Sequence, residues 1–539
     1  MIKAYSIADV RAAEARAMAA LPEGELMSRA SGGLAEVAAA RLAERGGRRV
    51  VALVGPGNNG ADALYAVGRL AQAGHNAAAV VSAARVDDEA VEAVLALGAT
   101  VVGGSDAHWH ALLEEADVVL DGITGIGGRP GLSAEARRWV DAVPADAWVV
   151  AVDLPSGTDP AGERACADTV FADETVTFSV AKPVHLLPAT EPAVGRLTMV
   201  DIGLDLDGFS PAVERLAHDD VAALWPVPTA GSDKYSRGVV GIVAGSPTYP
   251  GAAVLSVLGA LGAGPGMIRY LGAAEVVRLV HVAAPEVVTA PGRVQSWVVG
   301  SGMDPEDTSE AGTEQRRRVE EALASDLPVV VDAGALDLVE RRDAPTLLTP
   351  HAGELARLLT RLGAGPGGAR PGGAGPDGPG SGTSGSGTSG SGTSGSSASG
   401  SGTSGSGTSG SGKGPGRVEV TREDVTRAPL EHARAAALRT GATVLLKGAH
   451  TIVVSPDPKD PVRSQADGPP WLATAGAGDV LGGVLGTLCA AGLSPLDAGS
   501  LGALVHGVAA DRCNPGGPIR ARDVAHGIPA TVAALLARG

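Results

Sequence analysis

Aromatic residues are scarce in this sequence: they make up 3% of it, although hydrophobic residues make up 44%. Any globular core must therefore consist mainly of alanine, valine and leucine side chains. Cysteine is also scarce, and the three cysteines, Cys166, Cys489 and Cys513, are far apart and odd in number. This pattern provides neither a disulfide framework nor paired metal ligands, and it favours a protein of the reducing cytoplasm.

The chain also lacks an excess of positive charge and a long apolar run. Its 43 basic residues are outnumbered by 60 acidic ones, and the formal charge of −17 argues against nucleic acid or an anionic membrane as a partner. The longest apolar stretch, 251–267, is interrupted by glycine and proline and is too short to span a bilayer comfortably. The first residues carry charges where a signal peptide would need an apolar run.

The length of 539 residues exceeds what one hydrophobic core usually serves, so two or three domains are expected. Two regions alternate short β-branched runs with helical patterns, which is typical of layered α/β domains with parallel strands. The expected strands are 49–55, 77–82, 100–102, 117–120, 148–152, 239–244, 296–299, 328–331, 346–348 and 443–446. Between residues 363 and 416 nearly every residue is Gly, Ser, Thr or Pro, which predicts a flexible coil.

Three loops that follow expected strands of the first region carry acids and glycines. They are Gly57-Asn-Asn-Gly-Ala-Asp62, the segment from Asp121 to Gly131, and Asp153-Leu-Pro-Ser-Gly157. Each loop alone is compatible with an Asx turn or a helix cap. Ligands of parallel sheets lie beyond the carboxyl ends of the strands, so the three loops together favour a binding site.

The second region contains the turn Ala475-Gly-Ala-Gly-Asp479 directly before an apolar segment of helical length. Unpaired N–H groups at a helix start, the helix dipole and a closely approaching glycine backbone all suit a phosphate. A carboxylate beside a phosphate is explained if Asp479 takes a proton from a hydroxyl during phosphoryl transfer. Taken alone, the motif is more typical of a core helix whose aspartate satisfies backbone donors.

The first region resembles the NAD(P)HX epimerase domain, which is the N-terminal half of bifunctional nicotinamide-nucleotide-repair enzymes. The resemblance runs from about residue 12 to residue 204 and includes the three loops above and Ala181-Lys-Pro183. It implies a Rossmann-like three-layer domain that interconverts the two epimers of a hydrated reduced cofactor.

The same resemblance implies two sets of site residues. A potassium ion would be held by Asn59, Asp121 and Ser156, an oxygen-only set that suits a hard cation. The substrate would be contacted by Asn58, Asn59, Gly60, Asp62, Gly125, Gly127, Arg129, Gly131 and Asp153. The family loop usually has glycine where this chain has Ala61 and Ala63. If either position needs a positive φ or close backbone approach, the methyl groups impair the pocket, so a nucleotide-binding sensor with an inactive epimerase half is an alternative.

The second region carries Leu348-Thr-Pro-His-Ala-Gly-Glu354, Leu445-Leu-Lys-Gly448 and the Asp479 turn, in the order seen in ribokinase-like folds. More narrowly, it resembles the ADP-dependent NAD(P)HX dehydratase from about residue 217 to residue 536, without the Gly/Ser tract. Since one family pattern continues on both sides of the tract, we interpret the tract as an insertion within the second domain, which loop-closure entropy tolerates.

This resemblance implies that Asp479 is the catalytic base and that ADP and magnesium are cofactors. The substrate would be contacted by Ala252, Gly302, His351 and Asp479, and the nucleotide by Lys447, Gly448, Ala449, His450, Thr451, Gly476, Ala477 and Gly478. Glu354 lies where relatives place an acid that organises magnesium through water. Without this context, His351 would be interpreted as a hydrogen-bonded structural residue. Two positions depart from the family pattern: Ser301 would loosen a turn, and Gly334 removes an acid.

We therefore predict an α/β protein with a Rossmann-like domain at 1–215 and a ribokinase-like domain at 216–539, the latter with a disordered insertion at 363–416. The predicted function is the repair of hydrated NADH and NADPH: the first domain interconverts the R and S epimers, and the second dehydrates the S epimer with ADP. We expect a cytoplasmic homo-oligomer that binds NAD(P)HX and ADP but neither nucleic acid nor membrane. A kinase for a small alcohol or a vitamin precursor is the alternative, but it leaves the first domain unexplained.

Overall fold

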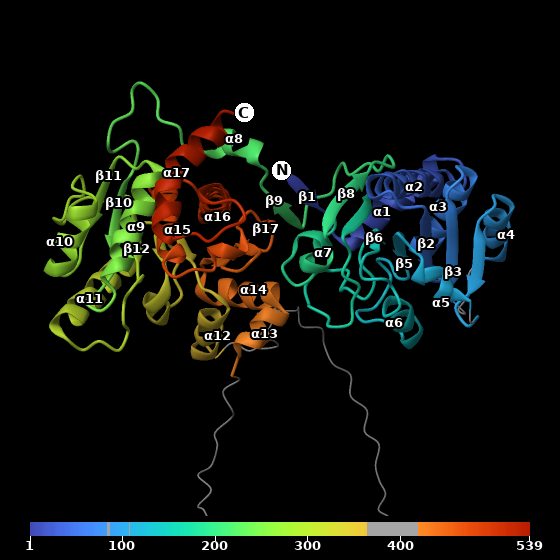
Figure 1. Ribbon diagram of the computed structural model, residues 1–539. Coiled ribbons are helices and arrows are strands. Elements are labelled where there is room, and N and C mark those ends of the chain that lie inside the picture. The colour runs from blue at the N-terminus through green and yellow to red at the C-terminus, as the bar shows by residue number, and fades with distance from the viewer. Residues whose placement is uncertain (83–86, 107, 364–418, 539) are drawn as a thin grey trace, which may run out of the picture.

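The computed structural model describes residues 1–82, 87–106, 108–363 and 419–538, which form two β-sheets with helices packed on them (Figure 1). This two-sheet α/β architecture confirms the predicted fold class. The coil predicted at 363–416 lies outside the described residues, except for Gly363. Among the helices that the structure describes, none has the length and apolar character of a membrane span.

The first sheet contains seven parallel strands in the spatial order β4-β3-β2-β5-β6-β7-β8. The strands are β2 (Arg49–Val54), β3 (Asn76–Val81), β4 (Thr100–Gly103), β5 (Val118–Gly122), β6 (Trp148–Val152), β7 (Glu174–Phe178) and β8 (Arg196–Val200). The helices and turns are α1 (Ile7–Ala20), α2 (Glu25–Arg45), α3 (Asn58–Gln72), α4 (Asp88–Ala96), α5 (Trp109–Glu114), α6 (Ala134–Val140), α7 (Pro183–Leu186) and η1 (Glu191–Ala193).

Alternate residues of β2 face two separate hydrophobic layers, as a strand buried on both faces requires. Val50 and Val54 pack in a layer with Leu34 of α2 and Leu64 of α3. Leu53 packs in the other layer, which includes residues of α5 and α6. The first half is therefore a three-layer domain, as predicted.

The second sheet contains ten strands in the spatial order β1-β9-β17-β16-β15-β14-β13-β12-β10-β11. The strands are β1 (Ile2–Ala4), β9 (Val213–Arg215), β10 (Val239–Val243), β11 (Met267–Tyr270), β12 (Ser296–Val299), β13 (Val329–Val331), β14 (Thr346–Leu348), β15 (Thr443–Leu446), β16 (Thr451–Val454) and β17 (Val462–Gln465). The helices and turns are η2 (His218–Asp220), α8 (Val221–Leu224), α9 (Pro250–Ala263), α10 (Ala274–Ala283), α11 (Glu310–Ala324), η3 (Ala333–Leu338), α12 (Ala352–Arg361), α13 (Arg422–Arg427), α14 (Pro429–Thr440), η4 (Pro470–Leu472), α15 (Ala477–Ala490), α16 (Pro495–Cys513) and α17 (Ala521–Leu536).

The first strand of the chain lies in the second sheet. β1 pairs antiparallel with β9, and β9 pairs parallel with β17, so both strands extend the sheet of the second half. Both also precede the boundary that we predict after residue 215, which remains a prediction. Further contacts join the halves: Arg164 and Arg434 form ion pairs of 3.0 Å with Glu431 and Glu163, respectively.

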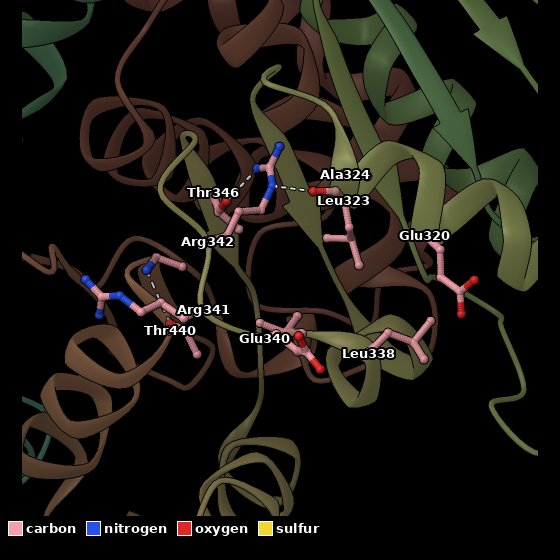
Figure 2. A pocket seen from close by; sticks show the side chains of 11 residues that line it. Glu320, Leu323, Ala324, Leu338, Glu340, Arg341, Arg342, Thr346 and Thr440 are labelled. Atoms are coloured by element: carbon pink, nitrogen blue, oxygen red, sulfur yellow. Dashed lines mark hydrogen bonds between the residues drawn. The ribbon is translucent and has the colours of Figure 1, made fainter.

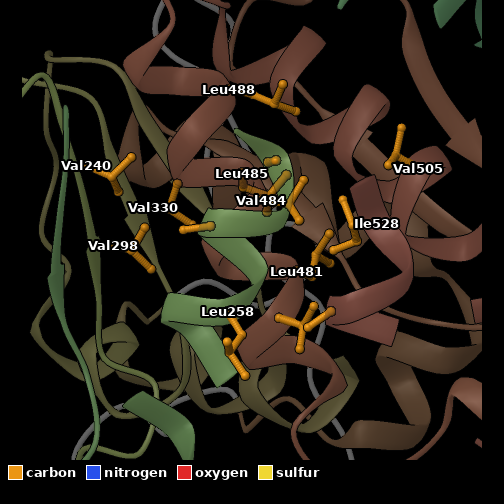
Figure 3. Packing of buried hydrophobic residues seen from close by; sticks show 14 of the residues in the cluster. Val240, Leu258, Val298, Val330, Leu481, Val484, Leu485, Leu488, Val505 and Ile528 are labelled. Carbon is orange, nitrogen blue, oxygen red and sulfur yellow. The ribbon is translucent and has the colours of Figure 1, made fainter. Parts of the chain in front are cut away.

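Helix α15 is buried between the second sheet and three other helices, α9, α16 and α17 (Figure 3). Its residues Val484, Leu485 and Leu488 are fully buried and pack with strand residues such as Val298. Glycine allows the close contact with α9: a Cβ at Gly483 would lie 2.1 Å from the carbonyl oxygen of Ser256. This packing fixes the N-terminal end of α15, where Asp479 lies.

Two neighbouring glycines of α15 provide a matched test of this packing. Gly483→Ala should lower the melting temperature, because the new Cβ meets the α9 backbone and overpacking costs about 1–3 kcal/mol. Gly482→Ala should not lower it, because the nearest atom lies at 3.6 Å and alanine favours a helix by about 1 kcal/mol. Equal melting temperatures for the two variants would contradict the close contact.

Candidate functional site

Four neighbouring strands of the second sheet end at the same edge, and a polar residue follows each of them. Ser301, Asp332, Thr349 and Lys447 follow β12, β13, β14 and β15, respectively. After their first residues the strands are short, mostly buried apolar runs, and polar side chains return where the strands end. Parallel pairing brings these side chains together at the edge where α/β proteins bind ligands.

The centre of this group is an ion pair between Lys447 and Asp332, whose Nζ and Oδ1 atoms are 2.6 Å apart. Thr349 donates a hydrogen bond of 2.9 Å to the same oxygen, and Ser301 donates one of 3.3 Å to Oδ2. Burial alone would raise the pKa of Asp332, but Lys447, Thr349 and the N–H of Ala333 hold the pKa below its usual range. Burial opposes the charge of Lys447, but Asp332 and Glu354 raise its pKa above the ordinary value.

Asp479 lies in the first turn of α15 beside this pair. Among the described residues, its carboxylate accepts no backbone hydrogen bond, so it is not the helix cap; Gly476 occupies the cap position. Burial and the charge of Asp332 raise the pKa of Asp479 to about 7, although a hydrogen bond from Ser301 and the charge of Lys447 oppose this shift. A carboxyl group with this pKa can accept a proton at neutral pH.

The turn before Asp479 forms a cradle for an anion. The backbone N–H groups of Gly478 and Asp479 form no hydrogen bond within the described part of the chain. Gly476 has a φ of 87°, and a Cβ there would lie 2.4 Å from Leu255 Cδ1, so only glycine fits. A Cβ at Gly478 would lie 3.3 Å from Lys447 Nζ. Free N–H groups, the helix dipole and a lysine therefore converge where a phosphate would bind.

His351 and Glu354 form a capping box at the start of α12. His351 Nδ1 accepts hydrogen bonds from the N–H groups of Gly353 and Glu354, and Glu354 accepts one of 2.8 Å from the N–H of His351. His351 therefore has a structural role as a helix cap, and its predicted contact with the substrate stays a prediction. Its Nε2 edge lies at the exposed rim of the site, and Glu354 Oε2 lies 3.8 Å from Lys447 Nζ.

The other residues predicted for this site fall into two groups. Gly302 and Ala252 are neighbours, since a Cβ at Gly302 would lie 2.6 Å from the Cβ of Ala252, and Gly302 directly follows Ser301. The segment Gly448-Ala449-His450-Thr451 connects β15 to β16. His450 Nε2 lies 3.6 Å from Glu191 Oε2 of η1 in the first half.

Both departures from the family pattern have a structural reason. Ser301 does not loosen its turn, because it is fully buried and bonded to Asp332. Gly334 leaves no room for an acid, because a Cβ there would lie 2.4 Å from the carbonyl oxygen of Met303.

A cavity of about 250 Å³ lies at the opposite edge of the same sheet, where β14 and β15 begin (Figure 2). Arg342 lines it, but its guanidinium donates to the carbonyl groups of Leu323, Leu327 and Pro345. The guanidinium of Arg342 is therefore engaged in hydrogen bonds that link loops of the protein. The cavity is separate from the Asp479 site.

In the first half, the structure brings the three predicted cation ligands together. Ser156 donates from both N and Oγ to the carboxylate of Asp121, at 2.8 and 2.6 Å. Asn59 Nδ2 donates to the carbonyl of Thr124, which also lies 3.5 Å from Ser156 Oγ. Burial raises the pKa of Asp121 to about 6, although Ser156 and Ile123 donate to it. Among the described residues no basic side chain pairs with Asp121, so this all-oxygen group suits a cation.

Beside this group, Asp153 forms an ion pair that we did not predict. Lys182 Nζ lies 2.5 Å from Asp153 Oδ1, and the lysine is 1% exposed. Burial alone would raise the pKa of Asp153, but Lys182, His185 and Thr177 hold it below its usual range. The only sequence signal for Lys182 was its place in the Ala181-Lys-Pro183 motif. Asp62 is buried nearby, and burial together with Asp153 and Glu14 raises its pKa to about 8.

The remaining residues predicted for the first site surround these two groups. A Cβ at Gly125 would lie 2.4 Å from Asn59 Oδ1, and the N–H of Gly131 donates to Gly157. Arg11 of α1 donates to the carbonyl of Ile126 in the same loop. Asn58 and Gly60 lie in the first turn of α3, and Gly127 and Arg129 lie on the loop after β5; Asn58, Gly127 and Arg129 are exposed.

Ala61 and Ala63 do not strain the loop. Both lie within α3, and neither is among the non-glycine residues with positive φ. Ala63 is fully buried against Gly122. The methyl groups therefore carry no backbone penalty, so a positive φ gives no support to the inactive-sensor alternative.

Two family models match this chain. One, described as YjeF-related protein N-terminus, matches residues 23–184, and the other, described as NAD(P)H-hydrate dehydratase, matches residues 240–369 and 420–518. The bifunctional NAD(P)H-hydrate repair enzyme Nnr of Mycobacterium leprae is 40% identical over 94% of this chain and 93% of its own length. Its counterpart in Mycobacterium tuberculosis is 40% identical over 91% of this chain and 89% of its own.

A solved ADP/ATP-dependent NAD(P)H-hydrate dehydratase from Bacillus subtilis, co-crystallised with ATP and Mg²⁺, is also similar. It is 22% identical, with a TM-score of 0.44, and the match covers 60% of this chain and 99% of the other.

The Lys447–Asp332 pair can be tested by stability alone. Lys447→Met should destabilise the second half by about 3 kcal/mol, because it leaves Asp332 buried without a cation. Combining it with Asp332→Asn should recover part of this loss, because no uncompensated charge remains. Additive losses in chemical denaturation would contradict the coupling.

Proposed function

The chain belongs to the family of bifunctional NAD(P)H-hydrate repair enzymes, and we propose that its two clusters are the active sites of the two activities. The Asp479 group would dehydrate the hydrated cofactor, and the Asp121 and Asp153 groups would bind it for epimerisation. The observation that carries the proposal for dehydration is Asp479 itself, a carboxyl group with a pKa of about 7 beside two free N–H groups. Because both halves match the family, a small-alcohol kinase has no support.

The chemistry of dehydration follows from this geometry. Asp479 would accept the proton of the ring hydroxyl as its oxygen attacks a phosphoryl group of ADP. The N–H groups of Gly478 and Asp479, together with Lys447, would stabilise the negative charge that this step concentrates. The transfer breaks the phosphorus–oxygen bond to AMP, which leaves. The phosphorylated oxygen then departs as phosphate, the adjacent ring carbon loses a proton to solvent, and the ring double bond is restored.

Magnesium fits the same site. Glu354 presents a carboxylate 3.8 Å from Lys447, and its hydrogen bond to the His351 N–H suits a carboxylate that holds a metal through water. The metal would neutralise phosphate charge. Ala252, Gly302 and the rim of His351 would contact the hydrated nucleotide, and Lys447 to Thr451 with Gly476 to Gly478 would contact ADP.

Potassium fits the Asp121 group. A buried carboxylate with a raised pKa and no basic partner is stabilised by a nearby cation. Asn59, Asp121 and Ser156 would hold the ion and thereby fix the loops that carry Gly125 and Asp153. The acidic charge of −17 supports the absence of nucleic-acid and membrane partners. The cytoplasmic location and the homo-oligomer remain predictions.

Asp479→Asn should abolish ADP-dependent recovery of the absorbance of the reduced cofactor, with a loss of roughly 10²-fold or more for a catalytic base. Asp497→Asn is the matched control, since Asp497 is also the third residue of its helix, α16, and lies outside the site. Equal activities of the two variants would remove Asp479 from the mechanism.

The rate of dehydration should rise with pH through a midpoint near 7, because the base must be ionised and its pKa is about 7. Asp332→Asn should move this midpoint to lower pH, because the variant removes a negative charge that raises the pKa of Asp479. Profiles of kcat/KM against pH for both proteins provide the measurement. A midpoint that stays in place, or moves upward, contradicts the assignment.

Potassium chloride should raise the melting temperature of the first half more than sodium chloride at equal ionic strength, because binding to the folded state alone stabilises it. Asp121→Asn should remove the difference between the salts. A difference that persists in the variant would place the ion elsewhere.

A further inference from the structure

Substrate and cation binding leave one feature of the first half unexplained, namely a buried group of ionisable side chains around Asp153. Its members come from four separate parts of the chain: Glu14 in α1, Asp62 in α3, Asp153 after β6, and Lys182 and His185 around the start of α7. Burying a lysine costs several kcal/mol unless its partner is well placed, so the pair needs a reason beyond packing.

The backbone holds Asp153 in one position. Asp153 has a φ of 67°, which is unfavourable for a non-glycine residue, and His185 Nε2 lies 2.7 Å from its carbonyl oxygen. Lys182 Nζ and Thr177 Oγ1 both donate to Asp153 Oδ1, at 2.5 and 2.9 Å. The side chain is thus oriented by two donors on one oxygen, which leaves Oδ2 without a hydrogen bond among the described residues.

The lysine is held as firmly as the aspartate. The N–H of Lys182 donates to His185 Nδ1 at 3.0 Å, and its Nζ also donates to Thr177 at 2.9 Å. The preceding residue, Ala181, forms a bridge with Ala4 of β1. Such over-determined placement is typical of preorganised sites.

Asp62 is unusual in a different way. It is 7% exposed, yet its carboxyl group forms no hydrogen bond with any residue that the structure describes. Buried polar groups normally have a partner, so an unpartnered carboxyl group in a site points to a ligand. Asp62 also lies within the electrostatic reach of Asp153 and Glu14.

On the basis of the proposed epimerase function, we propose that Asp153 and Asp62 are the base and the acid that open and close the hydrated nicotinamide ring, and that Lys182 is the positioning residue of this pair. The two carboxyl groups come from different elements and differ in partners: Asp153 is paired with a lysine, whereas Asp62 has no hydrogen-bond partner in the described part of the chain.

The chemistry needs one base and one acid. Hydration of the enamine double bond in a dihydropyridine places the hydroxyl on the carbon next to the ring nitrogen. Asp153 takes the hydroxyl proton, the carbon–nitrogen bond breaks, and its electron pair passes to the nitrogen, which receives a proton from Asp62. The products are an aldehyde and an open-chain amine; rotation about the adjacent carbon–carbon bond presents the other face of the aldehyde. Reversal of the same transfers closes the ring as the other epimer, with no net change in atoms or charge.

The surrounding charges favour an ionised Asp153 and a protonated Asp62 before the ring opens. Lys182 keeps Asp153 ionised, whereas burial, Asp153 and Glu14 raise the pKa of Asp62 to about 8. Burial and Asp153 raise the pKa of Glu14, although Lys182 and Arg11 oppose the shift. Burial and Lys182 lower the pKa of His185 to about 4, so it is neutral. A pair of carboxyl groups pushed apart in this way is how enzymes separate an acid from a base.

The test measures exchange between the two epimers from about pH 5 to about pH 9. Wild-type exchange should fall above about pH 8, as Asp62 loses its proton. Asp62→Asn and Asp153→Asn should each lower the exchange rate by roughly 10²-fold or more while substrate affinity changes only a few-fold. Asp141→Asn, at the exposed end of α6, is the control for removal of one carboxylate and should exchange normally.

Lys182→Gln separates positioning from packing. Without the lysine, burial raises the pKa of Asp153. Exchange by the variant should therefore fall at acidic pH, whereas exchange by the wild type should not fall there. If the role of Lys182 were purely structural, the substitution would lower the exchange rate by the same factor at every pH. That result would overturn the proposed positioning role of Lys182. ADP-dependent dehydration by the same chain shows that the second half remains folded.

Normal exchange by Asp62→Asn or Asp153→Asn would overturn the acid–base assignment and leave the epimerase function intact. Absence of exchange in the wild type would instead refute the proposed epimerase function itself.

Discussion

A lysine beside a buried aspartate lies at the carboxyl end of each central sheet, and the rest of each site depends on this pair. Lys447 contacts Asp332 in the second half, and Lys182 contacts Asp153 in the first, at 2.6 and 2.5 Å. Neither ion could be buried alone, since an unpaired charge in the protein interior costs several kcal/mol. Each pair therefore fixes a charged carboxylate where water is largely excluded.

The fixed negative charge raises the pKa of a second carboxyl group nearby. Beside Asp332, Asp479 has a pKa of about 7, and beside Asp153, Asp62 has a pKa of about 8. In both cases burial and the neighbouring negative charge act together. The halves differ in what surrounds the second group: Asp479 begins a helix with free N–H groups that suit a phosphate, whereas Asp62 lies beside an oxygen-rich group that suits a cation. The same electrostatic arrangement thus occurs in both proposed sites.

Much of this could be predicted from local sequence. Strands such as β2 and β13 are apolar β-branched runs, and glycine turns identified Asp121, Asp479 and Asn59. Strand β7 was missed because Glu174 and two threonines interrupt its apolar pattern; Glu174 is fully buried only because Arg41 and Arg196 pair with it.

Features that depend on contacts between distant parts of the chain could not be predicted from local sequence patterns. Strands β1 and β9 have three residues each, and most of the sequence of the first half lies between them. No local pattern therefore predicts that they pair. The roles of Asp332, Ser301 and Lys182 depend on which strand ends become neighbours. The burial of Ser301 against Asp332 likewise follows from tertiary structure and could not be read from its departure from the family pattern.

Infrared spectroscopy measures directly whether the carboxyl groups of Asp479 and Asp62 are protonated. Between pH 6 and pH 9, the wild type should show a protonated-carboxyl C=O band that disappears through the range of about 7 to about 8. Asp62→Asn and Asp479→Asn should each remove a part of it. A wild-type spectrum without this band, or a band that neither variant changes, would contradict the account.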